Sequence, residues 1–127
     1  MPLLPAFHPV IQPLDKDWQD LQMTFSYTFK NKPYEFHNGG LWAMITGFYV
    51  ADLAKRGQFE TAQKYQLAIH QANQQNPQGH EWGFYEYHHG QTLQANGTAF
   101  QSWSAAGALI GHYALQGKAV FRIDGIT

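Results

Sequence analysis

The sequence predicts a single all-α domain, and three observations support this prediction. Apolar residues recur at helical spacing in three long segments. Glycine and proline separate these segments, as they commonly do between helices. The chain has 127 residues, of which 44% are hydrophobic, so it is long enough and apolar enough to bury one core.

The N-terminal region is expected to contain three short pieces. Residues 1–14 include four prolines, which fix φ and remove backbone donors, so an extended arm is predicted. Asp15 to Gln22 are expected to form a short helix with Asp15 as its N-cap. Met23 to Phe29 alternate apolar and polar side chains, which indicates a strand or an extended segment lying on the core.

The first long helix is predicted to follow Asn38, which is a favourable N-cap residue, and to end at Gly57. Its expected apolar face consists of Leu41, Met44, Ile45, Phe48 and either Asp52 or Leu53. The second helix should run from about Gln58 to Gln75, because Pro77 and Gly79 end it. Its expected face consists of Phe59, Ala62, Tyr65, Ile69 and Ala72.

The third helix is expected over about Ala99 to Gln116, with Thr98 as its cap and a turn at Asn96-Gly97 before it. Its expected apolar face consists of Phe100, Trp103, Gly107, Ile110 and Ala114. Small residues around Gly107 should let another helix approach closely. All three helices have wide apolar faces, and such helices are normally packed between other helices. Three helices cannot cover these faces alone, so part of the fold is expected to be missing.

The segment from His80 to Gly90, HEWGFYEYHHG, shows neither a helical nor a strand period. It combines carboxylates, histidines and aromatic rings in a loop between helices, where functional residues are often found. Rings cover the apolar faces of a sugar, and acids bind its hydroxyls or act at its anomeric carbon. We therefore interpret the loop as part of a glycoside-processing site, with Tyr34, Tyr85 and Tyr87 lining a groove. The alternative is that the aromatic residues, 16% of the chain, serve only as core.

Composition argues against several classes of partner. The net charge of -1 provides no electrostatic footprint for nucleic acid or an anionic membrane. Cysteine is absent, so disulfides and thiolate metal sites are excluded. Adjacent His88 and His89 should point apart if extended, so no metal site and no cofactor are expected. The N-terminus does not resemble a signal peptide, and no apolar run has membrane-spanning length; a soluble cytoplasmic protein is expected.

Three motifs carry a resemblance to a known family. They are HNGGLW from His37, EYHHG from Glu86 and FQSWSAAG from Phe100. Their order and spacing resemble the C-terminal end of the neutral/alkaline invertases, where the corresponding patterns are HNGG.WP, EYYDG and YQTWSIAG. That family is grouped with trehalase-like inverting glycoside hydrolases, including chains described as amylo-α-1,6-glucosidases. The similarity covers residues 34–117.

The resemblance implies that the chain is the C-terminal portion of an (α/α)6 barrel whose sugar pocket lies at one end. It assigns Glu86 as the general base of an inverting hydrolase of a glucoside or sucrose-like sugar. The general acid in the family is an aspartate from an earlier part of the barrel, which no segment here resembles, so the chain alone should be inactive. The expected substrate-binding residues are His37, Asn38, Trp42, Trp82, Tyr85, Tyr87 and Glu81.

Three departures from the family pattern leave the sugar open. Ala43 replaces the proline after the tryptophan, His88-His89 replace Tyr-Asp, and Glu35 stands where a small polar residue is frequent. Two other functions also remain open. The chain could be a non-catalytic carbohydrate-binding remnant, or a helical module that completes a barrel with another chain or self-associates.

Overall fold

The computed structural model describes residues 4–6, 10–24, 28–79 and 81–118. Its helices and strands confirm the all-α class, because the two strands are only two residues long. In chain order the elements are α1 (Trp18–Met23), α2 (Ala43–Lys55), α3 (Phe59–Gln74), β1 (Tyr87–His88), β2 (Ala95–Asn96) and α4 (Ser102–Leu115).

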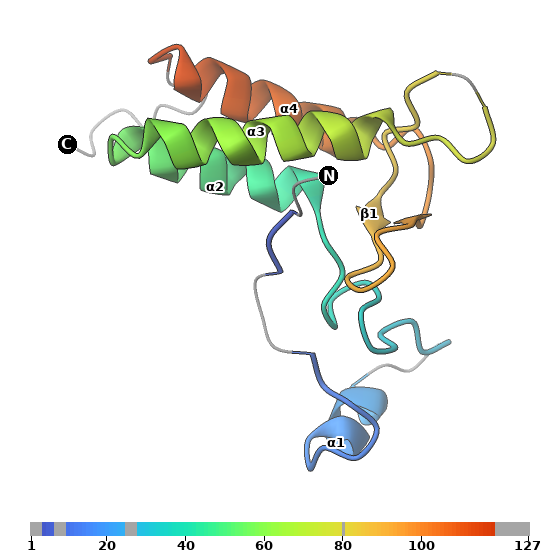
Figure 1. The fold of residues 1–127 in the computed structure, drawn as a ribbon. Coiled ribbons are helices and arrows are strands. Elements are labelled where there is room, and N and C mark those ends of the chain that lie inside the picture. The colour runs from blue at the N-terminus through green and yellow to red at the C-terminus, as the bar shows by residue number, and fades with distance from the viewer. Residues whose placement is uncertain (1–3, 7–9, 25–27, 80, 119–127) are drawn as a thin grey trace.

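The three long helices lie side by side, and α1 is set apart from them (Figure 1). α2 and α4 run in one direction and α3 in the other, so the N-terminal ends of α2 and α4 and the C-terminal end of α3 meet at one end of the bundle. The β1–β2 hairpin lies at this same end. The most extensive helix contact joins α2 to α4. No helix among the described residues combines the length and apolar character needed to cross a membrane.

Small residues form the contact between α2 and α4, which confirms the prediction of a close approach. Gly47 and Gly107 lie back to back, so that a Cβ at Gly107 would be 2.5 Å from the Ala43 carbonyl oxygen. The predicted faces of α2 and α4 are right for Leu41, Leu53, Gly107 and Ile110, which are buried, and wrong for several of the larger residues. Ile45, Phe48 and Trp103 are 37%, 45% and 38% exposed, because close packing turns the small residues inward. The side chains buried from the two helices include Thr46, Val50, Ser104 and Ile110.

The face of α3 is predicted more accurately. Ala62, Ile69 and Ala72 are fully buried, whereas Phe59 is 53% exposed at the first position of the helix. Polar Gln66 and Asn73 are also buried on this helix. The Asn73 amide donates to the Ser104 carbonyl oxygen at 2.9 Å, and the Gln66 amide donates to the Ala108 carbonyl oxygen at 2.9 Å. Two carboxamides therefore tie α3 to α4 without a salt bridge.

Several predicted helix boundaries are wrong. The N-cap residues are Asp17 for α1, Trp42 for α2 and Gln101 for α4, rather than Asp15, Asn38 and Thr98. Asp15 instead accepts a hydrogen bond from the Gln12 backbone amide at 2.7 Å, before the helix begins. Gly57 does end α2, with φ of +75°. Residues 25–27 of the expected strand lie outside the described residues, and the described Met23 belongs to α1.

Asn38 fastens the N-terminal arm to the body of the protein. Its side-chain oxygen accepts from the Ile11 backbone amide at 2.7 Å. Its amide nitrogen donates to the carbonyl oxygens of Ile11 at 2.9 Å and Asn31 at 3.1 Å. The side chain is only 2% exposed. Asn38 was predicted to cap a helix, but its hydrogen bonds hold two extended segments together.

Asn38→Ala should lower the free energy of unfolding by about 2 to 3 kcal/mol, because it removes three hydrogen bonds and leaves part-buried backbone groups of Ile11 and the buried carbonyl of Asn31 without these partners. Chemical denaturation measures this loss. Asn76→Ala is the matched control, because that side chain accepts a single hydrogen bond from Gln78 in an exposed turn. The control should lose less than about 1 kcal/mol. Equal losses would contradict the anchoring role.

Candidate active site

Backbone hydrogen bonds bring the three sequence motifs together at the hairpin end of the bundle. Leu41 and His88 exchange a pair of hydrogen bonds of 2.8 Å each, which joins the first motif to the second. The Phe100 amide donates to the Gly83 carbonyl oxygen at 2.7 Å, and the Ser104 hydroxyl donates to the Tyr85 carbonyl oxygen at 2.8 Å. The third motif is therefore joined to the segment that leads to Glu86. Residues far apart in sequence form one local structure.

Glu86 precedes β1 and is half-buried. Its backbone amide donates to the Thr98 carbonyl oxygen at 2.9 Å, and its Oε2 accepts from the Thr98 amide at 3.1 Å. Its other carboxylate oxygen makes no hydrogen bond, and the carboxylate no ion pair, with any residue that the structure describes. One oxygen is therefore held in place while the other remains available for chemistry.

Gly97 provides the space in which the Glu86 side chain lies. A Cβ at Gly97 would be 2.5 Å from Oε2 and 2.7 Å from the Cβ of Glu86. Gly97 also has φ of +76°, which side-chained residues rarely adopt. Both requirements favour glycine at position 97. The turn before α4 therefore packs directly against the Glu86 carboxylate.

Trp42 is the centre of a stack of rings. It stacks on His37 with centroids 5.2 Å apart and an interplanar angle of 2°, and on Tyr87 at 5.3 Å and 25°. Its indole nitrogen donates to the Phe36 carbonyl oxygen at 3.0 Å, and Trp103 lies edge-on at 6.0 Å. Trp42 and Tyr87 are buried, whereas His37 and Trp103 are exposed. The stack thus runs from the interior to the surface.

The sequence profile of the family described as alkaline and neutral invertase matches residues 1–117. The match covers more than half of the chain. The chain belongs to the alkaline and neutral invertase family. The resemblance inferred from the three motifs is thereby confirmed, and the match extends through the N-terminal arm as well. Searches of the curated proteins and of the solved structures gave no match.

In this invertase-family chain, Tyr85 and Tyr87 were expected to line a groove. They are instead 6% and 3% exposed, so the chain itself covers both rings. Burial raises the pKa of the Tyr87 phenol, a hydrogen bond with Asn96 opposes this shift, and the negative charges of Glu35 and Glu86 add to it. The Tyr87 hydroxyl is therefore neutral near pH 7. A direct sugar contact by these two rings stays a prediction.

The other expected binding residues differ in exposure. Trp82 is 41% exposed and stacks on Phe84 at 5.7 Å, so its outer face is accessible. Glu81 is exposed, and His80 lies outside the described residues. Both amide hydrogens of Asn38 are used within the protein, as described above, which leaves no donor for a sugar. His37 is exposed at the end of the ring stack and can contact a ligand.

His88 was expected in the candidate sugar-site loop and was weighed as a metal ligand, but the structure places it in the core. It is 1% exposed, and neither ring nitrogen has a hydrogen-bond partner among the described residues. Burial lowers its pKa from 6.5 to about 4, while the nearby Ala72 carbonyl opposes that shift without a hydrogen bond of ordinary geometry. Within the described ranges, no group of three or more His, Asp or Glu side chains could hold a metal ion.

Backbone strain is concentrated around the motifs. Among the described residues, those other than glycine with positive φ lie between positions 34 and 100: Tyr34, Phe36, Phe84, Leu93 and Phe100. Each such residue costs roughly 1 to 2 kcal/mol relative to an ordinary backbone conformation. Such conformations often cluster at functional sites, because surrounding contacts must maintain them. The strained positions flank the segments that carry His37, Glu86 and Trp103, which is consistent with a functional site here.

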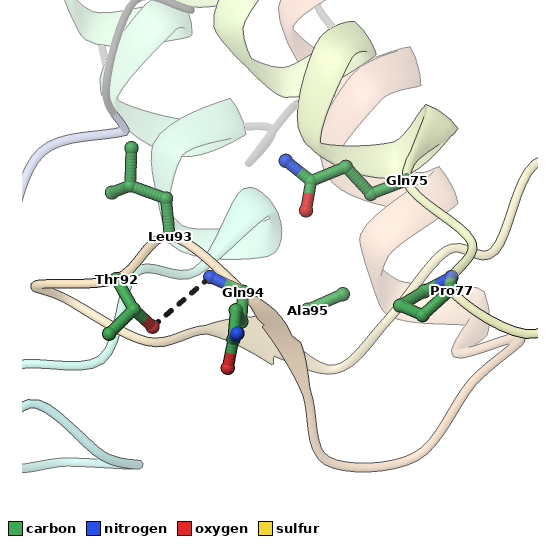
Figure 2. Close-up of a pocket in the computed structure, with 6 residues that line it drawn as sticks. All are labelled: Gln75, Pro77, Thr92, Leu93, Gln94 and Ala95. Atoms are coloured by element: carbon green, nitrogen blue, oxygen red, sulfur yellow. Dashed lines mark hydrogen bonds between the residues drawn. The ribbon is translucent and has the colours of Figure 1, made fainter.

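A hollow of about 590 Å³ lies between the end of α3 and the hairpin turn (Figure 2). It is lined by Gln75, Pro77, Thr92, Leu93, Gln94 and Ala95. Neither Glu86 nor the rings of the Trp42 stack line it. It is therefore separate from the expected sugar pocket, although it belongs to the same hairpin.

Proposed function

We propose that this chain is the general-base-bearing portion of an inverting glycoside hydrolase, with Glu86 as the base. The observation that carries the proposal is the state of the Glu86 carboxylate. The Thr98 backbone amide orients one carboxylate oxygen of Glu86. Among the described residues, the other oxygen accepts no hydrogen bond and the carboxylate forms no ion pair with a cationic side chain. A carboxylate held in this way can accept a proton from water as the water attacks an anomeric carbon.

Inversion requires a second carboxyl group on the opposite side of the sugar, roughly 6.5 to 9.5 Å away, so that a water molecule fits beside the base. Glu81 lies five positions before Glu86 in the same loop and would approach the sugar from the same side. We assign the acid to the remaining portion of an (α/α)6 barrel. The substrate class is a glucoside or a sucrose-like sugar. The cytoplasmic location expected from the sequence stays a prediction.

The chain alone is expected to hydrolyse sucrose, trehalose and α-glucosides at or near the rate in buffer. Loss of the general acid costs about 10²- to 10⁴-fold, and loss of substrate positioning by the rest of the barrel costs more. A sugar-release assay on the purified chain measures this. Ordinary turnover that Glu86→Gln abolishes would show that the chain carries a complete site, which would contradict the proposal of a partial one.

A helical module that completes a barrel with another chain is the second candidate, and the exposed apolar residues favour it. These residues lie on all three long helices: Ile45, Phe48, Phe59, Leu67, Trp103, Leu109 and Tyr113. Isolated domains rarely expose so many large apolar side chains on neighbouring helices. Gel filtration and co-purification test this candidate. A clean monomer that captures no partner would argue against it.

A non-catalytic carbohydrate-binding remnant is the remaining alternative, and the exposed face of Trp82 supports it. This function requires ring contact but no base. Sugar binding should then survive Glu86→Gln and be lost in Trp82→Ala. If Glu86 is instead the general base, both Glu86→Gln and Trp82→Ala should lower the hydrolytic activity of an enzyme that contains the whole barrel.

A further inference from the structure

The chain contains two Asn-Gly dipeptides, and the fold places them in different environments. Asn38-Gly39 lies in the first motif, and Asn96-Gly97 lies at the end of β2, before α4. In such a dipeptide the glycine backbone nitrogen can attack the carbonyl carbon of the asparagine side chain, because glycine has no side chain to hinder the approach. The two dipeptides are equally reactive as sequence, so their surroundings decide which of them reacts.

Asn38 is held away from this reaction. Its side-chain oxygen accepts from the Ile11 amide at 2.7 Å, and its nitrogen donates to the carbonyl oxygens of Ile11 at 2.9 Å and Asn31 at 3.1 Å. The side chain is 2% exposed, so water has little access to it. The backbone is also covered, because a Cβ at Gly39 would be 2.5 Å from Cγ2 of Val10. Reaction at Asn38 therefore requires the N-terminal arm to detach.

Asn96 lacks these restraints. It is half-buried, and Gly97 is exposed. Among the described residues, the Asn96 side chain has one polar contact, with the Tyr87 hydroxyl, and the Gly97 backbone amide donates no hydrogen bond. Asn96 is also the last residue of a strand only two residues long. Rotation of its backbone toward the reactive geometry disturbs the end of the hairpin but not the helices, and such local openings are the least costly in a folded protein.

We propose that Asn96 is a site of spontaneous deamidation in the folded chain. The Gly97 nitrogen loses its proton to solvent base and bonds to the side-chain carbonyl carbon of Asn96. The bond from that carbon to the side-chain nitrogen breaks, and ammonia leaves. Water then adds to one of the two carbonyl groups of the cyclic imide and opens the ring. Opening at one carbonyl gives aspartate, and opening at the other gives isoaspartate, whose backbone runs through the former side chain.

Either product changes the surroundings of Glu86. Asn96 pairs with Tyr87 across the hairpin, and the phenol of Tyr87 already experiences the negative charge of Glu86. A carboxylate at position 96 adds a second negative charge to this region. Isoaspartate also lengthens the backbone immediately before Gly97, which packs against Oε2 of Glu86, and so displaces the Thr98 amide that donates to this oxygen at 3.1 Å. Loss of catalysis rests on the proposed function of Glu86, whereas the deamidation itself does not.

Incubation of the purified, folded chain near pH 8, followed by digestion and tandem mass spectrometry, tests the proposal. The fragment with Asn96 should gain about 1 Da and become a substrate for an isoaspartyl methyltransferase. Conversion of Asn38 should be slower by at least about 10-fold, because three hydrogen bonds must open first. Asn76 is the internal control. It is half-buried like Asn96, but Pro77 follows it and has no N–H to lose, so it should remain intact.

Three further measurements separate the fold from the dipeptide. In denaturant, Asn38 and Asn96 should convert at similar rates. Asn96→Gln should abolish methyltransferase labelling of the folded chain while circular dichroism stays unchanged. In the aged chain, the Thr98 amide should exchange its hydrogen with solvent faster than in the fresh chain. Equal conversion of Asn38 and Asn96 in the folded chain, or conversion of Asn96 in denaturant only, would overturn the proposal. Neither result depends on hydrolytic activity, so a failed assignment of Glu86 as a base is detected separately.

Discussion

Gly107→Val is expected to prevent the long helices from packing and to leave the chain largely unfolded. A Cβ at Gly107 would be 2.5 Å from the Ala43 carbonyl oxygen and 2.7 Å from the Met44 Cα. Both are backbone atoms of α2, so they cannot move aside unless the helices separate. Overpacking of side chains in a core costs about 1 to 3 kcal/mol, and overlap with a helix backbone costs more. A small domain has little stability beyond that amount.

Thermal and denaturant unfolding, followed by circular dichroism, measure the effect of this substitution. Ala106→Val is the matched control, because Ala106 precedes Gly107 on α4 and is exposed. Its cost should be limited to helix propensity, less than about 0.7 kcal/mol. If Gly107→Val and Ala106→Val unfold at the same midpoint, the close contact of α2 with α4 is not what holds the bundle together.

Acidification from pH 7 to pH 4 is expected to remove about 3 kcal/mol of stability through His88. In the unfolded chain its imidazole titrates near 6.5, whereas burial lowers the folded pKa to about 4. Above pH 6.5 neither state carries the proton, so stability is at its full value. As the pH falls from 6.5 toward 4, only the unfolded state binds the proton, and the equilibrium shifts toward unfolding.

His88→Gln should therefore show a smaller loss of stability between pH 7 and pH 4 than the wild type, by about 3 kcal/mol. The difference between the two pH values is the relevant readout, because the substitution also changes the stability at pH 7. His112→Gln, at an exposed position on α4, should retain the wild-type loss. A wild-type pH dependence in His88→Gln would contradict the neutral, buried assignment of this imidazole.

The helices themselves could be predicted because their signals are local. Helical spacing placed α3 within one residue at each end, and Gly57 marked the end of α2. The buried faces of α2 and α4 could not be predicted from side-chain size. Gly47 and Gly107 determine how close the helices come, and that contact turns Phe48 and Trp103 outward. Which residues of α2 and α4 face inward therefore depends on how the two helices pack against each other.

The hairpin was not predicted, because β1 and β2 are each two residues long and show no alternation of their own. Asn96 and Gly97 were expected to form the tight part of a turn. Asn96 pairs with Tyr87 instead, and Gly97 lies against Glu86. Pairing with Leu41 and with β2 determines the conformation of this segment, and both partners are distant in sequence.

A sequence motif identified Glu86 as the candidate base. The contacts that surround its carboxylate could not be predicted from that motif. Thr98 holds the carboxylate through its backbone amide, which no side-chain pattern can signal, and the sequence suggested Thr98 only as a helix cap. Trp42 and Tyr87, both expected to bind the sugar, stack on each other. The chain itself covers both rings, as the alternative of a purely structural role for the aromatic residues would have it.

The most direct test of Glu86 as a base is the release of fluoride from α-D-glucosyl fluoride by the chain. Fluoride leaves without a proton, so this substrate needs a base but no general acid. We expect slow release above the rate in buffer, with β-glucose as the first product by NMR. Glu86→Gln should lower the catalysed rate by about 10²-fold or more. Glu60→Gln, an exposed glutamate on α3, should have no effect. Equal rates for the wild type and Glu86→Gln would contradict the account.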